Sequence, residues 1–534
     1  MSTTAKALTD EITVSIYLIR DTHENGMTLL EYADSVLAGT HDTLDHHNFN
    51  YQFGATQHNI DTVTNWATSH GLQVIEANSA TSTVKVKGTV SIFNSQFGIT
   101  LVDVTDDIRT YMNFTGTVTV PMAIAGVVER VLGFDQSFLA TRNAVQVPLN
   151  ATNPSVSTPS YSGAVTPQQV ATAYNLPPGD GNGGCIGIFE LTYSGYITGW
   201  SQTDVNNSFA RVGLTPPSIT NVALDGATIS TTSDPESMMD IYCAGGVAPK
   251  AKIVYYDAPN GGTQYINDII NTAATDTVNK PQVLSISWGI GDGTQFDSSM
   301  AACVVKGITV IVSSGDYGAR GSTTDSTSCH SPYAVIAGGT NIGITNGAKI
   351  GEYAWSGSGG GYSSSQTLPS WQAGLTYTTK NSSGNLGTPT TLPRRGIPDF
   401  SAPADPYTGY QFYNNGSLVQ YGGTSASAPW LAGMIVRLNQ LLGNRMGLPM
   451  PTLYSNSATA FTDITGGDNV DGYAIGYAAT TGWDACTGLG VPNGAGLYNL
   501  LRSYLGISST FPKQNYGFRP STGTLYPRRT SGVR

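Results

Sequence analysis

Between residues 185 and 313, short apolar runs alternate with helical segments, and this alternation constrains the fold more than any other feature of the chain. The apolar runs have the length and composition of buried parallel strands, and they cover Cys185–Phe189, Ala251–Tyr256, Gln282–Ser287 and Thr309–Ser313. The helical segments cover Gln202–Val212, Glu236–Ala244, Gln264–Thr277 and Ser298–Lys306. Because parallel strands need crossover connections, the pattern predicts a doubly wound α/β domain with functional groups at the carboxyl ends of its strands.

Residues 12–140 have a different pattern, which predicts a compact α+β unit. Helical runs at Leu29–Ala38 and Ile60–His70 are mixed with strand-like runs at Ile12–Ile19, Val84–Val90, Ile99–Val104 and Thr117–Val120. Residues 144–166 carry no charge and are rich in Pro, Ser, Thr, Asn and Val, as in linkers that proteases cut. We therefore predict an N-terminal domain at 1–143, a linker with a processing site at 144–166, a second domain at 167–507 and a flexible basic tail at 508–534.

Composition excludes several classes of function. The 534-residue chain has a net charge of −11, which argues against nucleic-acid binding, and no apolar run reaches the roughly 18 residues that a membrane span needs. The five cysteines have no CxxC spacing, so a zinc site is not expected; Cys303 and Cys329 are either a disulfide pair or buried free thiols. The N-terminus lacks the apolar core of a signal peptide, so we expect either a leader outside this sequence or another export route.

The stretch Gly422-Gly423-Thr424-Ser425-Ala426-Ser427-Ala428-Pro429 leads into an apolar helix and has the character of a nucleophile turn. Glycines permit a sharp turn, and the N-terminus of the helix offers N–H groups and a positive dipole end to a reactive serine. The same residue types form ordinary turns, so the interpretation depends on a base for Ser425. Six of the seven histidines lie in the N-terminal unit, and the seventh, His330, has no His-Gly-Thr setting. A Ser-His-Asp triad is therefore poorly supported.

Acidic residues supply the candidate base. Glu236 and Asp240 are spaced i and i+4 in a helical segment, so both lie on one face of the helix. Two adjacent carboxyl groups repel each other, and burial adds to this effect, so we expect one pKa to rise toward the working pH; the alternative is a solvated helix face. Asp316 ends a predicted strand in a Gly-Asp turn. At this position a protonated Asp316 can donate a hydrogen bond to a developing oxyanion. The alternative is that the residue only forms the turn.

These motifs, in this order, resemble those of the sedolisin family of serine-carboxyl peptidases, in its kumamolisin-like form with an N-terminal pro-region, over about residues 12–505. GGTSASAP, ExxxD and SSGDYG match the catalytic motifs, and further matches are Thr166–Pro177, Ser285–Gly289, Ser358–Ser363 and Pro398–Ala402. The resemblance implies a subtilisin-like α/β domain behind a ferredoxin-like α+β pro-domain, in a self-processing zymogen that works in acid. It also implies that Ser425 is the nucleophile, Glu236 the general base, Asp240 its proton-sharing partner and Asp316 the oxyanion donor.

Two further sites follow from the resemblance alone. Glu190 and Trp288 correspond to a pair that hydrogen-bonds outward from the catalytic glutamate. An all-oxygen shell suited to Ca²⁺ is implied near the C-terminus, made by the carboxylates of Asp463 and Asp484 and the backbone carbonyls of Ile464, Thr480 and Gly482. Asp468 and Asp471 are alternative ligands. The family usually has Gly where Thr480 stands and Ser where Gly422 stands, and neither departure removes a ligand atom or the nucleophile.

The resemblance also implies partners, and alternatives stay open. We expect protein or peptide substrates, the pro-domain as an intramolecular inhibitor, a monomer, and an extracellular or acidic location. Internal cleavage is favoured over removal of N-terminal tripeptides. A binding protein on a dead peptidase scaffold and a conventional subtilase that uses His330 are the alternative functions. The histidines of the pro-region, with the pair His46 and His47 as the first candidates, are either a pH trigger for activation or ordinary surface residues.

Overall fold

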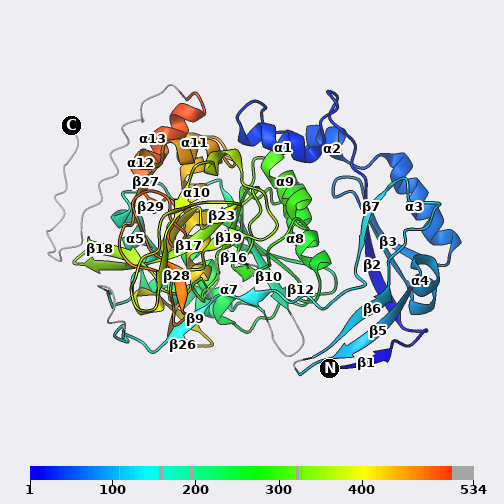
Figure 1. Ribbon diagram of the computed structural model, residues 1–534, viewed down its shortest axis with the longest axis horizontal. Coiled ribbons are helices and arrows are strands. Elements are labelled where there is room, and N and C mark those ends of the chain that lie inside the picture. Colours follow the sequence, from blue (N-terminus) through cyan, green and yellow to red (C-terminus); the bar gives the residue numbers. More distant parts are fainter. Residues whose placement is uncertain (108, 155–159, 193–197, 320–323, 326–327, 508–534) are drawn as a thin grey trace, which may run out of the picture.

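The computed structural model describes residues 1–107, 109–154, 160–192, 198–319, 324–325 and 328–507. The predicted basic tail and the middle of the predicted linker lie outside these residues. The described residues form two parts, a larger domain and a smaller N-terminal domain that lie side by side (Figure 1). No helix among them is long and apolar enough to cross a membrane.

An eight-stranded sheet forms the centre of the larger domain, and its pairings are parallel apart from β17–β18. The strand order is β11 (Ile219–Ala223), β12 (Lys252–Pro259), β10 (Cys185–Thr192), β13 (Val283–Ile286), β15 (Thr309–Ser313), β17 (Val335–Thr345) and β18 (Ala348–Ala354), with β24 (Phe400–Pro403) paired to β17. The chain starts at β10, visits β11 and β12 on one side, and then crosses to β13 on the other. This doubly wound topology confirms the prediction and places a switch point beside β10, where α/β sheets bind ligands.

Helices cover this sheet in two packed pairs. Helix α7 (Pro235–Val247) packs against α10 (Thr424–Leu442), and α8 (Thr263–Thr275) packs against α9 (Asp297–Val305). Figure 1 shows α8 and α9 on the side that faces the smaller domain. The apolar strands are buried because helices cover them, as the sequence pattern predicts.

The smaller domain has a ferredoxin-like core. Its antiparallel sheet has the order β3-β4-β2-β7, and its chain order is β-α-β-β-α-β. The elements are β2 (Glu11–Leu18), α3 (Gln57–Ser69), β3 (Gln73–Asn78), β4 (Thr83–Thr89), α4 (Val90–Phe97) and β7 (Val128–Leu132). A separate three-stranded sheet joins β1 (Ser2–Ala5) to the hairpin of β5 (Ile99–Thr105) and β6 (Thr110–Gly116). Thr117–Val120 is not a strand, contrary to the prediction, because Gly116 (φ 95°) turns the chain at the end of β6.

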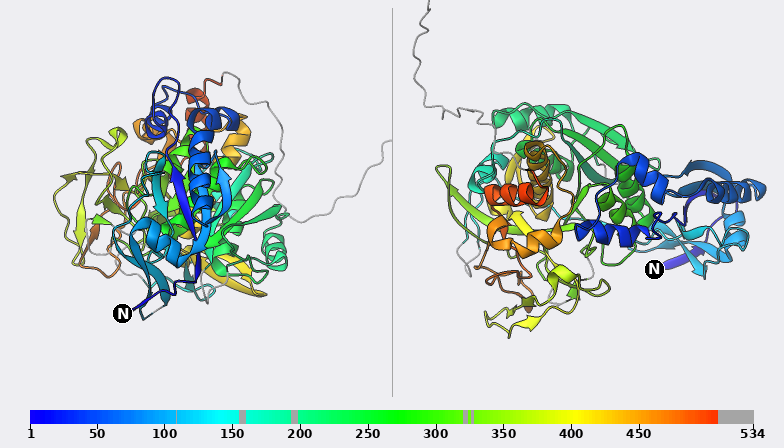
Figure 2. Two further views of the ribbon diagram at one scale, coloured as in Figure 1. Left: turned by 90° about the vertical axis from the view of Figure 1, so that its right-hand side faces the viewer. Right: turned by 90° about the horizontal axis from the view of Figure 1, so that it is seen from above.

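Two helices of the N-terminal region lie against the larger domain rather than within the ferredoxin-like core. These are α1 (Leu29–Leu37) and α2 (His46–Phe53), which we call the helical arm. Buried side chains of the arm, such as Tyr32 and Phe49, belong to the hydrophobic core of the larger domain. Figure 1 shows both helices above α9, and the right view of Figure 2 shows them between the two parts.

Candidate active site

Helix α7 holds two carboxyl groups in the interior of the larger domain. Asp234 caps its N-terminus by accepting hydrogen bonds from the Glu236 N–H (3.0 Å) and the Ser237 hydroxyl (2.5 Å), which fixes the first turn. The Ser287 hydroxyl lies 2.8 and 2.9 Å from the two carboxyl oxygens of Asp240. Glu236 is 1% exposed and Asp240 0%, so the alternative of a solvated helix face is wrong.

Burial raises the pKa of both carboxyl groups. For Glu236 it is the largest cause, and the nearby Ser425 hydroxyl and the Arg142 guanidinium oppose it. For Asp240 the negative charge of Glu236 adds to burial, whereas Ser287 opposes it, and the pKa is well above the ordinary value. Both Glu236 oxygens are buried, and no described residue meets the distance and angle of a normal hydrogen bond to them. Burial in a low-dielectric site disfavours the charged form of a carboxyl group, so the ionised form of Glu236 accepts a proton readily.

Ser425 lies in the first turn of α10, directly after a turn that requires glycine. Gly423 has a φ of 116°, and a Cβ there would lie 2.2 Å from the Asn143 carbonyl oxygen and 2.3 Å from Asp316 Oδ2. The Ser425 hydroxyl donates to the Ser287 carbonyl at 2.9 Å rather than to Glu236. The serine is thus beside the carboxylate but in a rotamer that points its proton elsewhere.

Asp316 follows β15 and turns toward the start of α10. Its Oδ1 accepts hydrogen bonds from the N–H (2.7 Å) and the hydroxyl (2.8 Å) of Thr424, which orient the carboxyl group. Its Oδ2 is buried without a partner and faces the same small space as the Asn143 carbonyl oxygen. Burial raises the Asp316 pKa well above its ordinary value, against the two bonds from Thr424. The protonated form therefore persists to higher pH than for an ordinary Asp, with a hydrogen available for that carbonyl oxygen.

The chain between the two domains passes through this site as an extended segment. Strand β8 pairs antiparallel with β14 and, three residues later, β9 pairs antiparallel with β26. These strands are β8 (Thr141–Arg142), β14 (Trp288–Gly289), β9 (Val145–Val147) and β26 (Ser417–Gly422). Between β8 and β9, the Asn143 carbonyl accepts a hydrogen bond from the Ser425 N–H at 3.2 Å. The sequence predicted a linker from residue 144 onward, but nothing in it indicated that residues 141–147 lie bound beside Ser425.

Arg142 anchors this segment beside the carboxyl pair. Its Nη1 lies 2.9 Å from Asp234 Oδ1, and its guanidinium lies 5.1 Å from the centre of a Trp288 ring. Its positive charge also lowers the pKa values of Glu236 and Asp240 against the effect of burial. The segment is therefore held by its side chains as well as by its backbone.

Comparison with known proteins decides the family. Residues 4–137 match the family described as "Pro-kumamolisin, activation domain", and residues 226–476 match the "Subtilase family". The chain is 35% identical over 489 residues to kumamolisin from Bacillus sp. (strain MN-32), and the match covers 86% of each chain. The chain belongs to the sedolisin family of serine-carboxyl peptidases.

Two further relatives agree with this assignment. Sedolisin from Pseudomonas sp. (strain 101) is 33% identical over 301 residues, which cover 51% of this chain and 49% of the relative. A solved structure of Pseudomonas sedolisin, a serine-carboxyl proteinase complexed with two molecules of pseudo-iodotyrostatin, is similar with a TM-score of 0.52 and 27% identity. That match covers 64% of this chain and 99% of the solved chain. The subtilisin-like fold and the N-terminal pro-domain are thereby confirmed.

The second carboxyl site lies next to the first in this sedolisin-family chain. The Trp288 indole N–H donates to Glu190 Oε2 at 3.1 Å, and both side chains are fully buried. Burial, followed by the charges of Asp240 and other nearby acids, raises the Glu190 pKa well above its ordinary value. The structure therefore brings together the two residues that the resemblance paired, although their role in catalysis stays a prediction.

The five residues of the predicted calcium site lie on two segments, 463–464 and 480–484, that are joined by a hydrogen bond. Asp463 Oδ2 accepts from the Gly482 N–H at 2.8 Å, and Asp484 Oδ2 accepts from the Thr480 N–H at 2.9 Å. Among the described residues, the backbone carbonyls of Ile464, Thr480 and Gly482 accept no hydrogen bond, so they are available as ligands. Two carboxylates and free carbonyls form the oxygen-only donor set that Ca²⁺ prefers.

The two alternative calcium ligands lie elsewhere. Asp468 forms an ion pair with Lys380 at 2.7 Å, and its charge is thereby compensated. Asp471 lines a cavity of about 370 Å³ that it shares with Asp316 and Trp355. The predicted set of Asp463 and Asp484 is therefore the better candidate.

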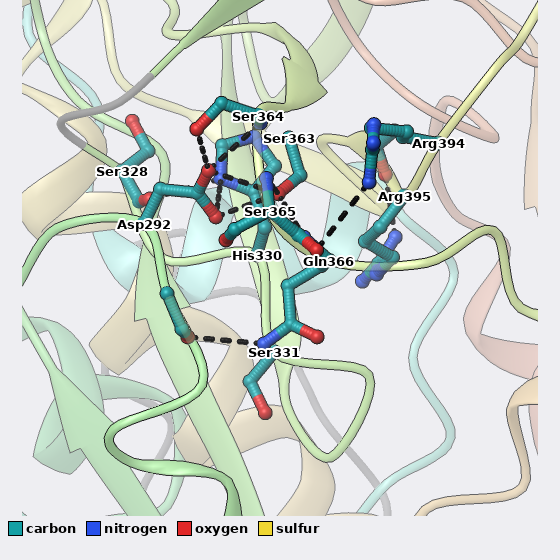
Figure 3. Close-up of polar contacts among 12 residues, drawn as sticks. Asp292, Ser328, His330, Ser331, Ser363, Ser364, Ser365, Gln366, Arg394 and Arg395 are labelled. Carbon is teal, nitrogen blue, oxygen red and sulfur yellow. Dashed lines mark hydrogen bonds and ion pairs between the residues drawn. The ribbon is translucent and has the colours of Figure 1, made fainter.

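His330, the histidine of the alternative subtilase mechanism, belongs to another polar cluster (Figure 3). Its Nδ1 lies 2.9 Å from the Ser328 carbonyl and 3.4 Å from Asp292 Oδ1. Asp292 also accepts hydrogen bonds from the hydroxyls of Ser363 (2.7 Å) and Ser364 (2.8 Å), and these bonds and His330 lower its pKa against burial. The imidazole is fully buried and fixes loops to one another. The Ser425 hydroxyl donates to the Ser287 carbonyl rather than to this imidazole, which argues against the conventional triad.

The cysteines play no part in the site. All five are buried free thiols, so Cys303 and Cys329 do not form the disulfide that the sequence left open. Burial raises the pKa of both thiols to about 12, which keeps them protonated and unreactive.

Proposed function

We propose that this chain is an acid-active endopeptidase zymogen that activates itself by cutting the bond between Asn143 and Ala144. The observation that carries the proposal is the Asn143 carbonyl oxygen, which accepts from the Ser425 N–H and faces Asp316 Oδ2. This is the geometry of a scissile carbonyl in an oxyanion hole. The bound segment also fills the substrate groove, so the pro-domain inhibits the enzyme until the bond is cut.

The reaction follows from the positions of the four side chains. Ser425 turns from the Ser287 carbonyl to Glu236, which takes its proton as Oγ attacks the Asn143 carbonyl carbon. The Ser425 N–H and protonated Asp316 stabilise the oxyanion, and Asp240 shares the proton that Glu236 has gained. Glu236 then returns a proton to the leaving nitrogen of Ala144. A water molecule hydrolyses the acyl-enzyme by the same steps, with Glu236 again as base.

The same segment favours internal cleavage over removal of tripeptides. Asn143, Arg142 and Thr141 would be the three residues before the cut. The bound segment does not end there, because Ala140, the fourth residue before the cut, is held as well. There the Asn260 side chain accepts from the Ala140 N–H (3.0 Å) and donates to its carbonyl (2.9 Å). A groove that binds the fourth residue suits an endopeptidase acting on protein or peptide substrates. An extracellular or acidic location fits this activity.

The position of the first cut is directly testable. We expect acidification of the full-length protein to produce a new N-terminus at Ala144, read by intact mass and N-terminal sequencing. Ala144→Pro removes the N–H and distorts the scissile amide, so it should slow this cut at least tenfold. A first cut at another bond in wild type, before any product beginning at Ala144, would contradict the proposed register.

The pH dependence should depend on Asp316. Because its protonated form donates to the oxyanion, the rate should fall as pH rises through its raised pKa. Asp316→Asn offers an amide N–H at the position of Oδ2 at every pH, so the alkaline decline of kcat/KM should move to higher pH. Asp316→Ala should instead lose roughly 10²–10³-fold at all pH values. An unchanged alkaline limb in Asp316→Asn would exclude this residue as the titrating donor.

We also propose that the cluster of Asp463 and Asp484 holds one structural Ca²⁺. The ion would neutralise two neighbouring carboxylates and join two turns of the peptidase domain. A chelator should then lower the melting temperature by roughly 5 °C. Asp463→Asn should lower it in the same way and abolish the effect of the chelator, whereas Asp471→Asn should leave that effect intact. If Asp471→Asn abolished the effect of the chelator and Asp463→Asn left it intact, the site would be reassigned to Asp471.

A further inference from the structure

Beyond the catalytic site, the helical arm makes a contact with the peptidase domain that only an uncharged histidine can make. The Lys306 Nζ, at the C-terminal end of α9, lies 2.8 Å from the His46 Nδ1, on the first residue of α2. A lysine ammonium has donors only, so His46 must accept through a neutral Nδ1. Nε2 then carries the ring proton and lies 2.9 Å from the Asn50 side-chain amide, which must present its oxygen to accept that proton.

Other contacts hold the same end of the arm on α9. The Leu44 N–H donates to the Val305 carbonyl at 2.7 Å, which satisfies one carbonyl at the end of the helix. The Lys306 ammonium also lies 5.2 Å from the centre of the Phe49 ring, and Phe49 is fully buried. The arm is thus docked through its backbone, an aromatic ring and the His46–Lys306 hydrogen bond together.

The surroundings of His46 are basic and open to water. Among the described residues, the cavity beside His46 is lined from the peptidase domain by Lys306, Lys280, Arg445 and one acid, Asp276. From the arm it is lined by Asp45 and His47. Asp276 is already engaged by Asn279 and Tyr256. The cavity measures about 570 Å³, so solvent protons reach the pair.

We propose that protonation of His46 undocks the helical arm from the peptidase domain, so that this contact is an acid-sensitive lock on the zymogen. Protonation removes the acceptor of Lys306 and sets two cations 2.8 Å apart. Burial first, and then the charge of Lys306, lowers the His46 pKa, while Asp45 opposes this shift. The pKa of His46 is lower when the arm is docked than when it is free, where a histidine has a pKa of about 6.5. The contact therefore stabilises docking at pH values above about 6.5, and this stabilisation is lost as the pH falls below that value. The lock therefore opens in the acid range in which the proposed peptidase works.

The test measures arm docking without relying on catalysis. In full-length protein carrying Ser425→Ala to block self-cleavage, amide hydrogen exchange of α2 is followed from pH 7.5 to pH 5. We expect the protection factors of α2 to fall about tenfold over this range, relative to those of α3. His46→Asn keeps an acceptor for Lys306 that does not titrate, so in this variant the protection factors of α2 should change less than about twofold over the same pH range. His47→Asn, at the exposed neighbouring position, should behave as wild type.

A second variant keeps the test decisive if His46→Asn disturbs the helix. Lys306→Gln removes the opposing cation, so the pH-dependent loss of α2 protection should also disappear. The proposal is overturned if α2 protection in the parent protein does not change with pH. It is overturned equally if both variants keep the full tenfold loss, because another group would then be the sensor. Since Ser425→Ala is inactive under the proposed function, neither outcome bears on the catalytic assignment.

Discussion

Ser425→Ala is expected to abolish both self-cleavage at Asn143–Ala144 and hydrolysis of added peptides. In the proposed mechanism the hydroxyl is the one group of the enzyme that forms a covalent bond, and loss of a serine nucleophile lowers kcat by on the order of 10⁶-fold in serine proteases. Ser425 Oγ has one hydrogen bond, to the Ser287 carbonyl, so its removal should change stability little. Intact-mass analysis after incubation at acidic pH, with a melting curve to confirm folding, measures the effect.

A nearby serine provides a matched control. Ser427 is two residues away, fully buried, and its hydroxyl donates to the Gly338 carbonyl at 2.7 Å. The same hydroxyl accepts from the Ala402 N–H at 3.1 Å, so Ser427→Ala removes two structural hydrogen bonds and should cost about 2 kcal/mol of stability while the protein still cleaves itself. Cleavage that persists in Ser425→Ala in the absence of any other protease would contradict the assignment of the nucleophile.

Glu236→Gln should lower the rate of self-cleavage by roughly 10⁴-fold, the upper range for loss of a general base. Glutamine fills the same space in the buried site but cannot take the Ser425 proton. Because burial disfavours a charge at this position, a neutral amide of the same size should leave the fold intact, which a melting curve checks. Single-turnover rates at several pH values between 3 and 6 would show the loss across the whole range. A loss restricted to one end of the range would point instead to an electrostatic role.

The sequence predicted the doubly wound sheet well because its strands are uniformly apolar and separated by helical segments. It also placed Glu236, Asp240, Asp316 and Ser425 at element ends or on one helix face, where short-range patterns are informative. It did not predict α2, since HHNFNYQF has little apolar periodicity and the helix depends on Phe49 and Phe53 packing into the core of the other domain. Tertiary packing of this kind leaves little trace in local sequence.

The binding of residues 141–147 in the active site was also beyond the reach of the sequence. Val145–Val147 forms a strand only because β26 supplies hydrogen bonds, and Arg142 is ordered by Asp234 from a distant segment. Ser287 is a similar case: the motif around it was recognised, but its contacts with Asp240 on α7 and with Ser425 on α10 arise because both helices lie beside the end of β13. Such residues are found only when the chain is seen in three dimensions.

In the proposed mechanism a buried carboxylate, and not a histidine, activates Ser425. This assignment is tested most directly by the rate of self-cleavage at pH 4 in Glu236→Gln beside His330→Asn, each checked for folding by its melting curve. We expect Glu236→Gln to lose about 10⁴-fold, whereas folded His330→Asn should stay within about tenfold of wild type. Near-normal cleavage by Glu236→Gln, together with complete loss in a folded His330→Asn protein, would contradict the assignment.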